Sequence, residues 1–442
     1  MRSLDITIDR RLVGTLKEGD DLWQFAYDPQ WGQAPDGFDL APGLPRAQAV
    51  HVDGGTSRPV QWYFDNLLPE ELLRTAISKE AGIKGEDAFA LLEYLGAESA
   101  GSLTLLPPGQ PLPQSASLRP LADAQLSQRI RELPRQTLTA GAPKRMSLAG
   151  AQHKLLVTCL DGVLYEPSGA TPSTHILKPN HPDTDNYPAS VVNEYVTMRL
   201  ARAAGLPVPE VHLRYVPQPV YFIDRFDRRW KASGVDAAGM PLLEVQRLHI
   251  IDACQLLNRA RTFKHSGASL QALSDVIDRT TNKIRSRLGL FRWLVFNLLV
   301  ANDDCHLKNL SFFQSPDGVQ LAKHYDLMAT SAYYTKAFAN EKATWPDVPM
   351  AIALPGATRF SEVTRQAVIA AAGVLGVPPR LAEPTIQEVA SKVAAALPLE
   401  REALARRHAQ AAAESRPYLA SEERVLSVME NIVLADMLKR LA

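Results

Sequence analysis

The chain has 442 residues, 46% hydrophobic and 22% charged, which is typical of a globular protein with two or three domains. Its 48 basic and 48 acidic side chains cancel, so the overall charge gives no support to nucleic-acid or membrane binding by the whole protein. The three cysteines form no CxxC pair, the N-terminus lacks the apolar core of a signal peptide, and no apolar run approaches about 18 residues, so we expect a cytoplasmic protein without a membrane span.

The first hundred residues mix strand and helix patterns. Residues 4–16 alternate between apolar and polar side chains and predict a β-hairpin, while residues 70–81 and 86–94 have helical spacing that stops near a glycine. Residues 103–106 predict a strand that ends at a Pro-Pro-Gly break. We therefore expect an α+β subdomain over residues 1–106, followed by a proline-rich linker with a short helix over residues 107–144.

Short strands are predicted from about residue 145. Apolar runs at 154–158, 175–178 and 220–224 have strand character, and a helix over 190–204 is stopped by Gly205. These runs assign residues 145–244 to a strand-rich lobe. Residues 245–442 have mostly helical periodicity, including a strongly apolar and therefore buried helix at 288–301, and we expect them to form an all-helical lobe.

The segment after this apolar helix carries the clearest chemical signal. Asp304 and Asn309 have the spacing of the protein-kinase catalytic loop, and Asp326 follows the next apolar stretch. In phosphoryl transfer an aspartate orients the acceptor hydroxyl, while an asparagine and a second aspartate hold Mg²⁺ against the phosphates of ATP. The alternative interpretations are a simple helix-terminal turn and a metal site at His306 and His324, for which a third and fourth ligand are lacking.

Three upstream segments are candidates for completing an ATP site. The small residues around Gly150 precede a strand and let backbone N–H groups approach phosphates, although an ordinary turn has the same composition. Lys178 ends a strand and Glu194 lies on the next helix, which is how kinases hold the α- and β-phosphates. Residues 224–226 close a further strand where the adenine would lie, and the alternative there is a charged strand end.

In chain order, these motifs resemble the HipA-type toxin kinases of bacterial toxin–antitoxin modules. The resemblance covers almost the whole chain and rests on several long, ordered segments. The matching segments are Arg11–Gly14, Tyr27–Pro29, Phe64–Glu70, Gly96–Leu103, Ser147–Lys154, His175–Lys178, Asn193–Tyr195, Asp224–Arg228, Asp304–Asn309 and Tyr325–Leu327.

The resemblance implies a non-specific serine/threonine protein kinase with an α+β, two-lobed, protein-kinase-like fold and an extra N-terminal subdomain. It implies that Asp304 is the catalytic residue, that Asn309 and Asp326 are the Mg²⁺ ligands, and that Glu194 supports Lys178 as an ion pair. The positions implied to bind ATP are Ala149, Gly150, Ala151, Gln152, His153, Lys154, Lys178, Asp224, Arg225, Phe226, His306, Leu307, Lys308, Asn309, Tyr325 and Asp326.

Ser147 matches the serine that members of this family autophosphorylate, which ejects the loop and silences the kinase. Nearly two added negative charges in a loop that approaches ATP phosphates give this inactivation a physical reason. The sequence departs from the family where Asp224 replaces a common glutamate and where His153 occupies an often acidic position. Residues 325–327 replace the Asp-Phe-Gly of ordinary protein kinases.

The resemblance also implies partners and a biological role. It implies a HipB-type helix-turn-helix antitoxin dimer, through which operator DNA is bound, and a protein substrate. Characterised members phosphorylate aminoacyl-tRNA synthetases, notably glutamate–tRNA ligase, which stalls translation and causes growth arrest and persistence. The competing hypotheses are a small-molecule kinase of the aminoglycoside-phosphotransferase type and an inactive kinase-fold co-repressor; the presence of Lys178, Asp304, Asn309 and Asp326 argues against the second.

Overall fold

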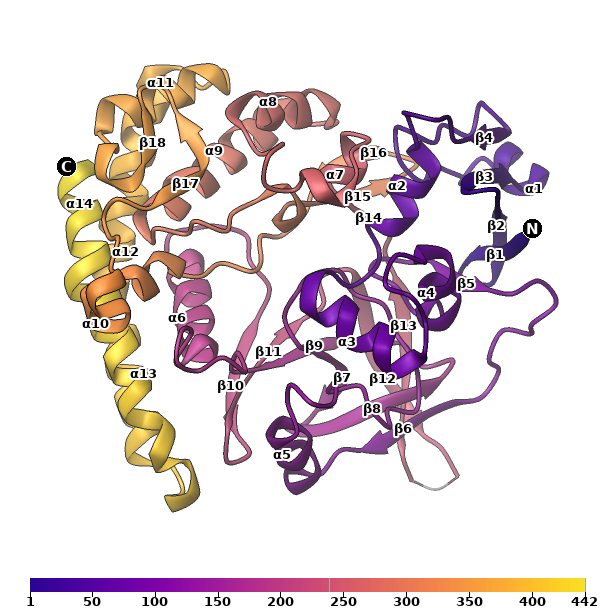
Figure 1. Ribbon diagram of the computed structural model, residues 1–442, viewed down its shortest axis with the longest axis horizontal. Helices are drawn as coiled ribbons and strands as arrows, with labels where there is room; N and C mark the ends of the chain where they lie inside the picture. The colour runs from indigo at the N-terminus through magenta and orange to yellow at the C-terminus, as the bar shows by residue number, and fades with distance from the viewer. Residues whose placement is uncertain (238, 442) are drawn as a thin grey trace. The chain divides into compact units, whose positions relative to one another are not determined.

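The computed structural model describes residues 1–237 and 239–441 (Figure 1). The chain divides into two units that each pack internally. Unit 1 contains residues 1–178, 224–263 and 311–320, and unit 2 contains residues 179–223, 264–310 and 321–442. Unit 1 contains most of the strands, and unit 2 contains most of the long helices.

A five-stranded antiparallel sheet opens unit 1, in the order β4-β3-β2-β1-β5. The predicted hairpin is confirmed as β1 and β2, in which Leu4 faces Leu16 across the ladder and both are fully buried. Gly14 is required in β2, because a Cβ there would lie 2.3 Å from the carbonyl oxygen of Ala26. The strands are β1 (Arg2–Ile8), β2 (Arg11–Gly19), β3 (Leu22–Tyr27), β4 (Val50–Val52) and β5 (Thr104–Leu106).

Four helices accompany this sheet, and the two predicted ones are found. The helix over Glu71–Ala81 ends where Gly82 adopts a left-handed conformation with φ of 67°, and the helix over Ala88–Leu95 begins where Asp87 accepts a hydrogen bond from the Ala90 N–H. The helices are α1 (Pro29–Gln33), α2 (Pro59–Asp65), α3 (Glu71–Ala81) and α4 (Ala88–Leu95).

A second sheet of unit 1 has the order β9-β7-β8-β6. The strands predicted at 154–158 and 175–178 are β7 and β9, and the short helix predicted in the linker is α5. Strand β6 was not predicted, and it lies inside the proline-rich stretch, where it pairs with β8. The elements are β6 (Ala116–Pro120), α5 (Asp123–Arg131), β7 (Leu155–Leu160), β8 (Val163–Gly169) and β9 (His175–Pro179).

Unit 1 also contains a long hairpin and a small three-stranded sheet. The hairpin strands pair through Trp230 and Val245, and most of the first strand is exposed. The elements are β12 (Arg228–Val235), β13 (Pro241–Arg247), β14 (Ile250–Asp252), α7 (Ala253–Leu256), the 3₁₀ turn Arg261–Phe263, β15 (Ser311–Ser315) and β16 (Gly318–Leu321).

Unit 2 is built around α9, whose Phe291, Trp293 and Phe296 are fully buried, as the apolar pattern predicts. Helix α12 packs against both α6 and α9. The elements are α6 (Ser190–Ala203), β10 (Val211–Tyr215), β11 (Pro219–Asp224), α8 (Leu270–Arg279), α9 (Lys283–Leu299), α10 (Lys336–Ala339), β17 (Pro349–Leu354), β18 (Ala357–Arg359), α11 (Arg365–Val374), α12 (Pro379–Ala409), α13 (Arg416–Val428), the π-helix Met429–Leu434 and α14 (Ala435–Leu441), with 3₁₀ turns at Leu307–Asn309, Thr330–Tyr334, Asn340–Lys342, Phe360–Glu362 and Ala413–Ser415.

The prediction of an all-helical region over residues 245–442 needs correction, because short strands occur in it. Strand β15 pairs with β14, and β17 pairs with β18. Phe312 of β15 and Ile251 of β14 are buried partners, so these short strands are stabilised by distant pairing rather than by a local pattern.

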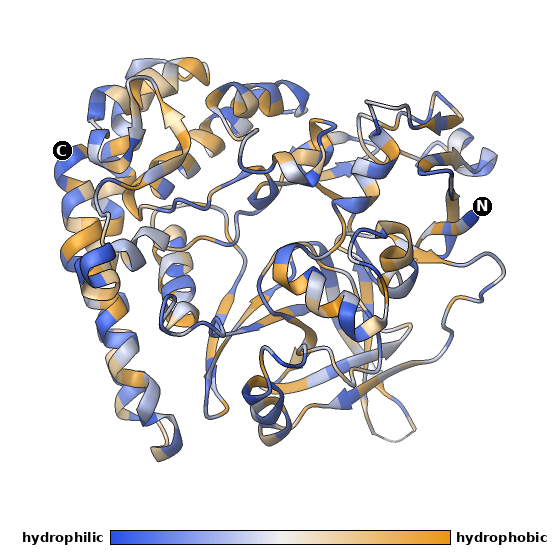
Figure 2. Cartoon of the chain, viewed as in Figure 1, coloured by the Kyte–Doolittle hydropathy of each residue, from blue (hydrophilic) through white to orange (hydrophobic). Residues whose placement is uncertain are grey.

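Along the C-terminal helices α13 and α14, hydrophilic and hydrophobic residues alternate (Figure 2). Val425, Leu426 and Met437 are buried on one side of this stretch. None of the helices in the described ranges combines the length and the apolar character that crossing a membrane requires.

Candidate functional site

The predicted catalytic aspartate lies in a loop that is fixed by its own backbone and by two asparagines. Helix α9 ends at Leu299, and Ala301 then adopts a left-handed φ of 48°. The side chain of Asn302 donates to Asn297 Oδ1 at 2.8 Å and accepts the Asp304 N–H at 3.1 Å. The Asp304 backbone is thus fixed, while its side chain remains 57% exposed and reachable from solvent.

Asn309 closes the same loop. It ends the 3₁₀ turn Leu307–Asn309, and its Nδ2 donates to the carbonyl oxygen of Asp304 at 2.8 Å. Because the amide nitrogen is the donor in this bond, the amide oxygen is the atom of this side chain suited to a cation. The interval of five residues between Asp304 and Asn309 thus corresponds to one hydrogen-bonded loop.

Asp326 adopts a left-handed backbone conformation with φ of 56°, which is uncommon outside glycine and costs conformational energy. Its neighbour Tyr325 donates from its hydroxyl to the carbonyl oxygen of Lys308 at 2.9 Å. The segment that carries Asp326 is therefore attached directly to the loop that carries Asn309.

Asn193 on α6 holds the other side of the Asp326 segment. Its Nδ2 donates to the Ala329 carbonyl at 3.1 Å, and its Oδ1 accepts the Ala329 N–H at 2.8 Å. The next residue, Glu194, is buried, and burial together with the nearby carboxylates of Glu194 and Asp326 raises the pKa of Tyr221. Glu194 and Asp326 therefore lie near the same buried hydroxyl group in unit 2.

The histidines of unit 2 differ in their surroundings. His324 is fully buried and stacks on Trp293, and burial lowers its pKa to about 4. Among the described residues it belongs to no cluster of three metal-binding side chains, which argues against the metal site considered with His306. Cys305 is also buried, and burial raises the pKa of its thiol.

In unit 1, the serine of the predicted phosphate loop is buried and docked on the front subdomain. The Ser147 N–H donates to the Glu98 carbonyl at 2.7 Å, and the Ser147 hydroxyl donates to the Leu67 carbonyl at 2.6 Å. The carbonyl oxygen of Gly150, three residues after Ser147, accepts a hydrogen bond from the Glu70 N–H at 3.2 Å. The loop is therefore held in place by three backbone positions of the front subdomain.

The same loop is closed internally by a lysine. Lys154 Nζ donates to the Ala149 carbonyl at 2.6 Å, across the turn at Gly150. Gly150 has a φ of 110°, a backbone conformation that requires glycine, whereas a Cβ there would meet only the movable end of the Lys154 side chain, 2.6 Å from Nζ. Ala151, Gln152 and His153 lead from this turn into β7.

The other predicted nucleotide-binding residues of unit 1 lie at or just after the ends of β9 and β11. Lys178 is buried near the end of β9, while the Asp224 carboxylate lies 3.1 Å from His175 Nε2. The Phe226 ring packs edge-on against Phe313, with 6.0 Å between ring centroids. Lys178 belongs to unit 1 and Glu194 to unit 2, so the ion pair between them stays a prediction.

Arg225 does not present its side chain to a nucleotide, because its guanidinium is part of a buried charge cluster. We define the Glu98 cluster as Glu98, Lys144, Arg225, Asp227 and Arg228. The fully buried Glu98 carboxylate lies 2.9 Å from Lys144, 3.0 Å from Arg228 and 3.2 Å from Arg225. Asp227 binds the two arginines at 2.7 and 2.8 Å.

The charges of this cluster shift its pKa values strongly. Burial alone would raise the pKa of Glu98, but Lys144, Arg228 and Arg225 outweigh it and hold that pKa well below its usual range. For Asp227 burial acts in the same way, and Arg225 and Arg228 lower its pKa to about 2. Both carboxylates are therefore ionised at neutral pH.

This cluster was not predicted, although four of its five members, Glu98, Arg225, Asp227 and Arg228, lie in the segments that resemble the family. It connects the front-subdomain segment Gly96–Leu103 with the strand-end segment Asp224–Arg228, since Asp227 also accepts the Gly101 N–H at 2.8 Å. A signal for this cluster was present in the sequence, because both segments contain charged residues. Charged side chains that become buried need partners of opposite charge.

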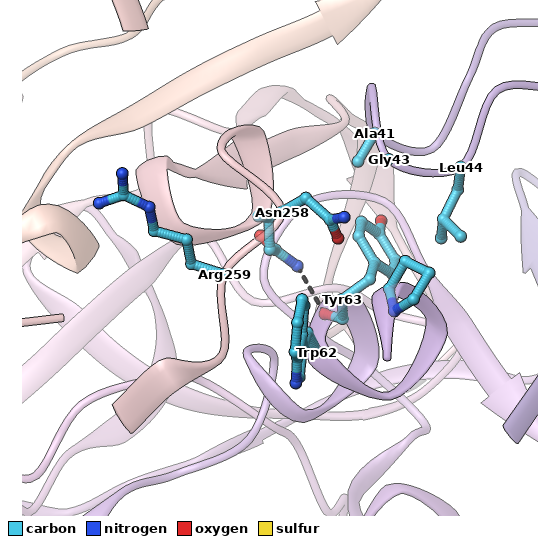
Figure 3. Close-up of a pocket in the computed structure, with 9 residues that line it drawn as sticks. Ala41, Gly43, Leu44, Trp62, Tyr63, Asn258 and Arg259 are labelled. Atoms are coloured by element: carbon cyan, nitrogen blue, oxygen red, sulfur yellow. Dashed lines mark hydrogen bonds between the residues drawn. The ribbon is translucent and has the colours of Figure 1, made fainter. Parts of the chain in front are cut away.

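Elsewhere in unit 1, residues of α2, of α7 and of the loop near Gly43 line a small, shallow pocket (Figure 3). Trp62 and Tyr63 form one wall, and Gln255 Nε2 donates to the Tyr63 carbonyl at 2.9 Å. None of the predicted nucleotide-binding residues lines this pocket, so it is separate from the candidate site.

Comparisons with known proteins agree with these motifs. The model of the HipA-like C-terminal domain matches residues 146–397, and the model of the HipA N-terminal domain matches residues 4–106. The chain is 33% identical over 348 residues to a Sinorhizobium fredii protein named as kinase Y4mE, covering 75% of this chain and 78% of that one. It is 30% identical over 331 residues to the serine/threonine-protein kinase toxin HipA of Shewanella oneidensis, covering 71% of each.

A solved structure has the same fold along nearly the whole length. It is the complex of Shewanella oneidensis HipA, HipB and operator DNA, with a TM-score of 0.75 and 24% identity, covering 99% of both chains. This match confirms the predicted α+β, two-lobed, kinase-like fold class.

Glu98→Gln is expected to cost about 3–5 kcal/mol of unfolding free energy, because it leaves Lys144, Arg225 and Arg228 buried without their shared anion. Denaturant unfolding measures this loss. The matched control is Glu244→Gln, which breaks an exposed pair with Lys231 at 2.8 Å and should leave the unfolding free energy nearly unchanged. Equal losses in the two variants would show that the cluster does not stabilise unit 1.

The same cluster predicts acid sensitivity. The pKa of Asp227 falls from 3.8 to about 2 on folding, so its stabilisation is fully present above pH 3.8 and is lost as the pH falls toward 2. Glu98 shifts in the same direction. Unfolding free energy measured from pH 5 downward should therefore decrease, and the slope should be smaller in Asp227→Asn.

Proposed function

Because the chain belongs to the HipA family of kinase toxins, we propose that it is an ATP-dependent serine/threonine protein kinase that arrests growth. The observation that carries the proposal is the loop from Asp304 to Asn309. In this loop the Asp304 carboxylate is exposed, and the Asn309 side-chain amide is held by its hydrogen bond to the Asp304 carbonyl oxygen. Asp304 orients the acceptor hydroxyl and takes its proton during phosphoryl transfer.

The residues around this loop fit a magnesium–nucleotide complex. The Asn309 amide oxygen and the Asp326 carboxylate are oxygen donors, which Mg²⁺ prefers. A bound Mg²⁺ ion would neutralise negative charge on the phosphates. Lys178 contacts the phosphates, and Glu194 orients that lysine.

The remaining predicted positions divide into side-chain and backbone roles. Residues 149–154 offer backbone N–H groups to the phosphates, and the turn at Gly150 is suited to close approach. Asp224 and Phe226 border the adenine, where Arg225 contributes only backbone atoms. His306, Leu307 and Lys308 are buried, so they shape the loop beside the nucleotide rather than reach into solvent.

The partners follow from the same family membership. The solved Shewanella oneidensis relative is bound to HipB and operator DNA, which supports a HipB-type helix-turn-helix antitoxin dimer here, with operator DNA bound through it. The protein substrate is an aminoacyl-tRNA synthetase such as glutamate–tRNA ligase, and its phosphorylation stalls translation. Such a role places the protein in the cytoplasm.

The competing functions are less well supported. A small-molecule kinase has no need of the front subdomain, whereas here the Glu98 cluster makes that subdomain part of unit 1. An inactive co-repressor has no need of an exposed Asp304 on a loop fixed by Asn302 and Asn309.

Ser147 is the switch of this kinase. In the docked loop its hydroxyl is buried and donates to Leu67, so phosphorylation requires the loop to leave the front subdomain. A phosphate on Ser147 cannot return to the same place, because the carbonyl oxygens of Leu67 and Glu98 would face its negative charge. Autophosphorylation therefore prevents the loop from returning to the front subdomain and inactivates the enzyme.

Asp304→Asn is expected to lower the rate of ATP-dependent protein phosphorylation by at least about 100-fold, because the variant side chain cannot accept the hydroxyl proton. Incorporation of radiolabelled phosphate measures the rate. The control is Asp278→Asn, which changes an exposed carboxylate paired with Lys283 on the surface of unit 2. Undiminished labelling by Asp304→Asn would contradict the assigned base.

Self-labelling with ATP is expected at Ser147 and should disappear in Ser147→Ala, which removes the acceptor hydroxyl. Peptide mass spectrometry locates the phosphate. Phosphorylated protein should also show faster amide hydrogen exchange at Ser147, because its N–H loses the bond to Glu98. The control is Ser117→Ala on the exposed strand β6, and equal labelling of Ser147→Ala and wild type would refute the switch.

A further inference from the structure

Two histidines flank the predicted catalytic aspartate in unit 2. The Asp304 carboxylate oxygen Oδ1 lies 3.9 Å from His265 Nδ1 and 3.9 Å from His306 Nε2. The two imidazole rings meet edge to face, with 4.7 Å between their centroids. One potential ligand atom from each of these side chains lies within 4.8 Å of the others.

The backbone fixes this arrangement from both sides. The Leu307 N–H, next to His306, donates to the carbonyl of Lys264, next to His265, at 3.2 Å. The side chain of His306 is only 8% exposed, whereas those of His265 and Asp304 are 54% and 57% exposed. The cluster therefore combines one anchored imidazole with two side chains that are open to solvent.

We propose that His265, Asp304 and His306 bind a zinc ion, and that the ion inhibits the kinase by coordinating the Asp304 carboxylate, its catalytic base. The proposal rests on the proposed function only for the inhibition, since the binding depends on the three side chains alone. Two imidazole nitrogens and one carboxylate form a common ligand set for Zn²⁺, with a water molecule as the fourth ligand.

The observed distances suit this ion after a small movement. Zinc bonds of about 2.0–2.1 Å in tetrahedral geometry place neighbouring ligand atoms about 3.3 Å apart. The separations of 3.9 Å from Asp304 therefore need to shorten by about half an ångström, which the exposed side chains of His265 and Asp304 can provide by rotation. Mg²⁺ is a weak competitor for this cluster because it prefers oxygen ligands.

Zinc binding changes the chemistry available to Asp304. A carboxylate oxygen that donates its electron pair to Zn²⁺ no longer accepts the proton of an acceptor hydroxyl. Asp326, proposed to hold Mg²⁺ together with Asn309, is not a member of the cluster. Zinc should therefore lower the phosphorylation rate without displacing the nucleotide.

The first experiment measures binding without catalysis. The full-length protein, freed of metal by chelator, is titrated with Zn²⁺ by calorimetry and with Co²⁺ by visible absorption. Wild type should bind one equivalent and give the absorption of tetrahedral Co²⁺, while His265→Gln should bind at least about tenfold more weakly, since even supporting groups of metal sites contribute that much. His181→Gln is the matched control, because among the described residues His181 belongs to no metal-binding cluster.

The second experiment measures phosphorylation with excess Mg²⁺ and rising Zn²⁺. Wild type and His181→Gln should be inhibited at the Zn²⁺ concentrations that saturate the site, and His265→Gln should require at least about tenfold more. Equal Zn²⁺ affinity in wild type and His265→Gln overturns the zinc site, and equal inhibition of the two overturns its control of activity. If wild type binds Zn²⁺ through His265 but never transfers phosphate from ATP, the site stands and the proposed kinase function fails.

Discussion

The buried Glu98 carboxylate is the interaction on which the arrangement of unit 1 depends. Three cations surround it, and breaking such a group is far more costly than losing a surface pair, because the remaining charges stay out of water. The backbone of the same residue accepts the Ser147 N–H. One residue of the front subdomain thus binds both the segment that follows β11, through Arg225 and Arg228, and the start of the loop at Ser147.

Unit 2 achieves comparable rigidity by neutral hydrogen bonds. Asn302, Asn309 and Asn193 each bind backbone or side-chain atoms of segments that carry the acidic residues. Amides suit this task because one side chain both donates and accepts, without the desolvation cost of a charge. These neutral bonds position the segments that carry Asp304 and Asp326.

The sequence predicted those features whose cause is local. The β1–β2 hairpin, the helices α3, α4, α6 and α9, and the spacing from Asp304 to Asn309 all follow from periodicity or from a single loop. Strands β6 and β15 were missed because distant partners stabilise them.

The candidate site was predicted less completely than its central loop. Arg225 was assigned to the nucleotide through the family resemblance, and nothing in the sequence identified Glu98, more than a hundred residues earlier, as the residue that binds its side chain. Likewise, Asn193 gave no sign of its bonds to Ala329, since nothing local distinguishes it from any polar helix residue. Such pairings become visible only once the fold brings distant segments together.

The Glu98 cluster also affects whether the N-terminal and C-terminal parts of this protein can fold separately. The two family matches, residues 4–106 and 146–397, divide the chain as if it were two separable parts. Physically, the anion at position 98 lies in one part, and the arginines at 225 and 228 lie in the other. A polypeptide starting at residue 145 would keep the arginines and Asp227 but lose the Glu98 anion, so the kinase part alone is expected to be less stable than the whole chain.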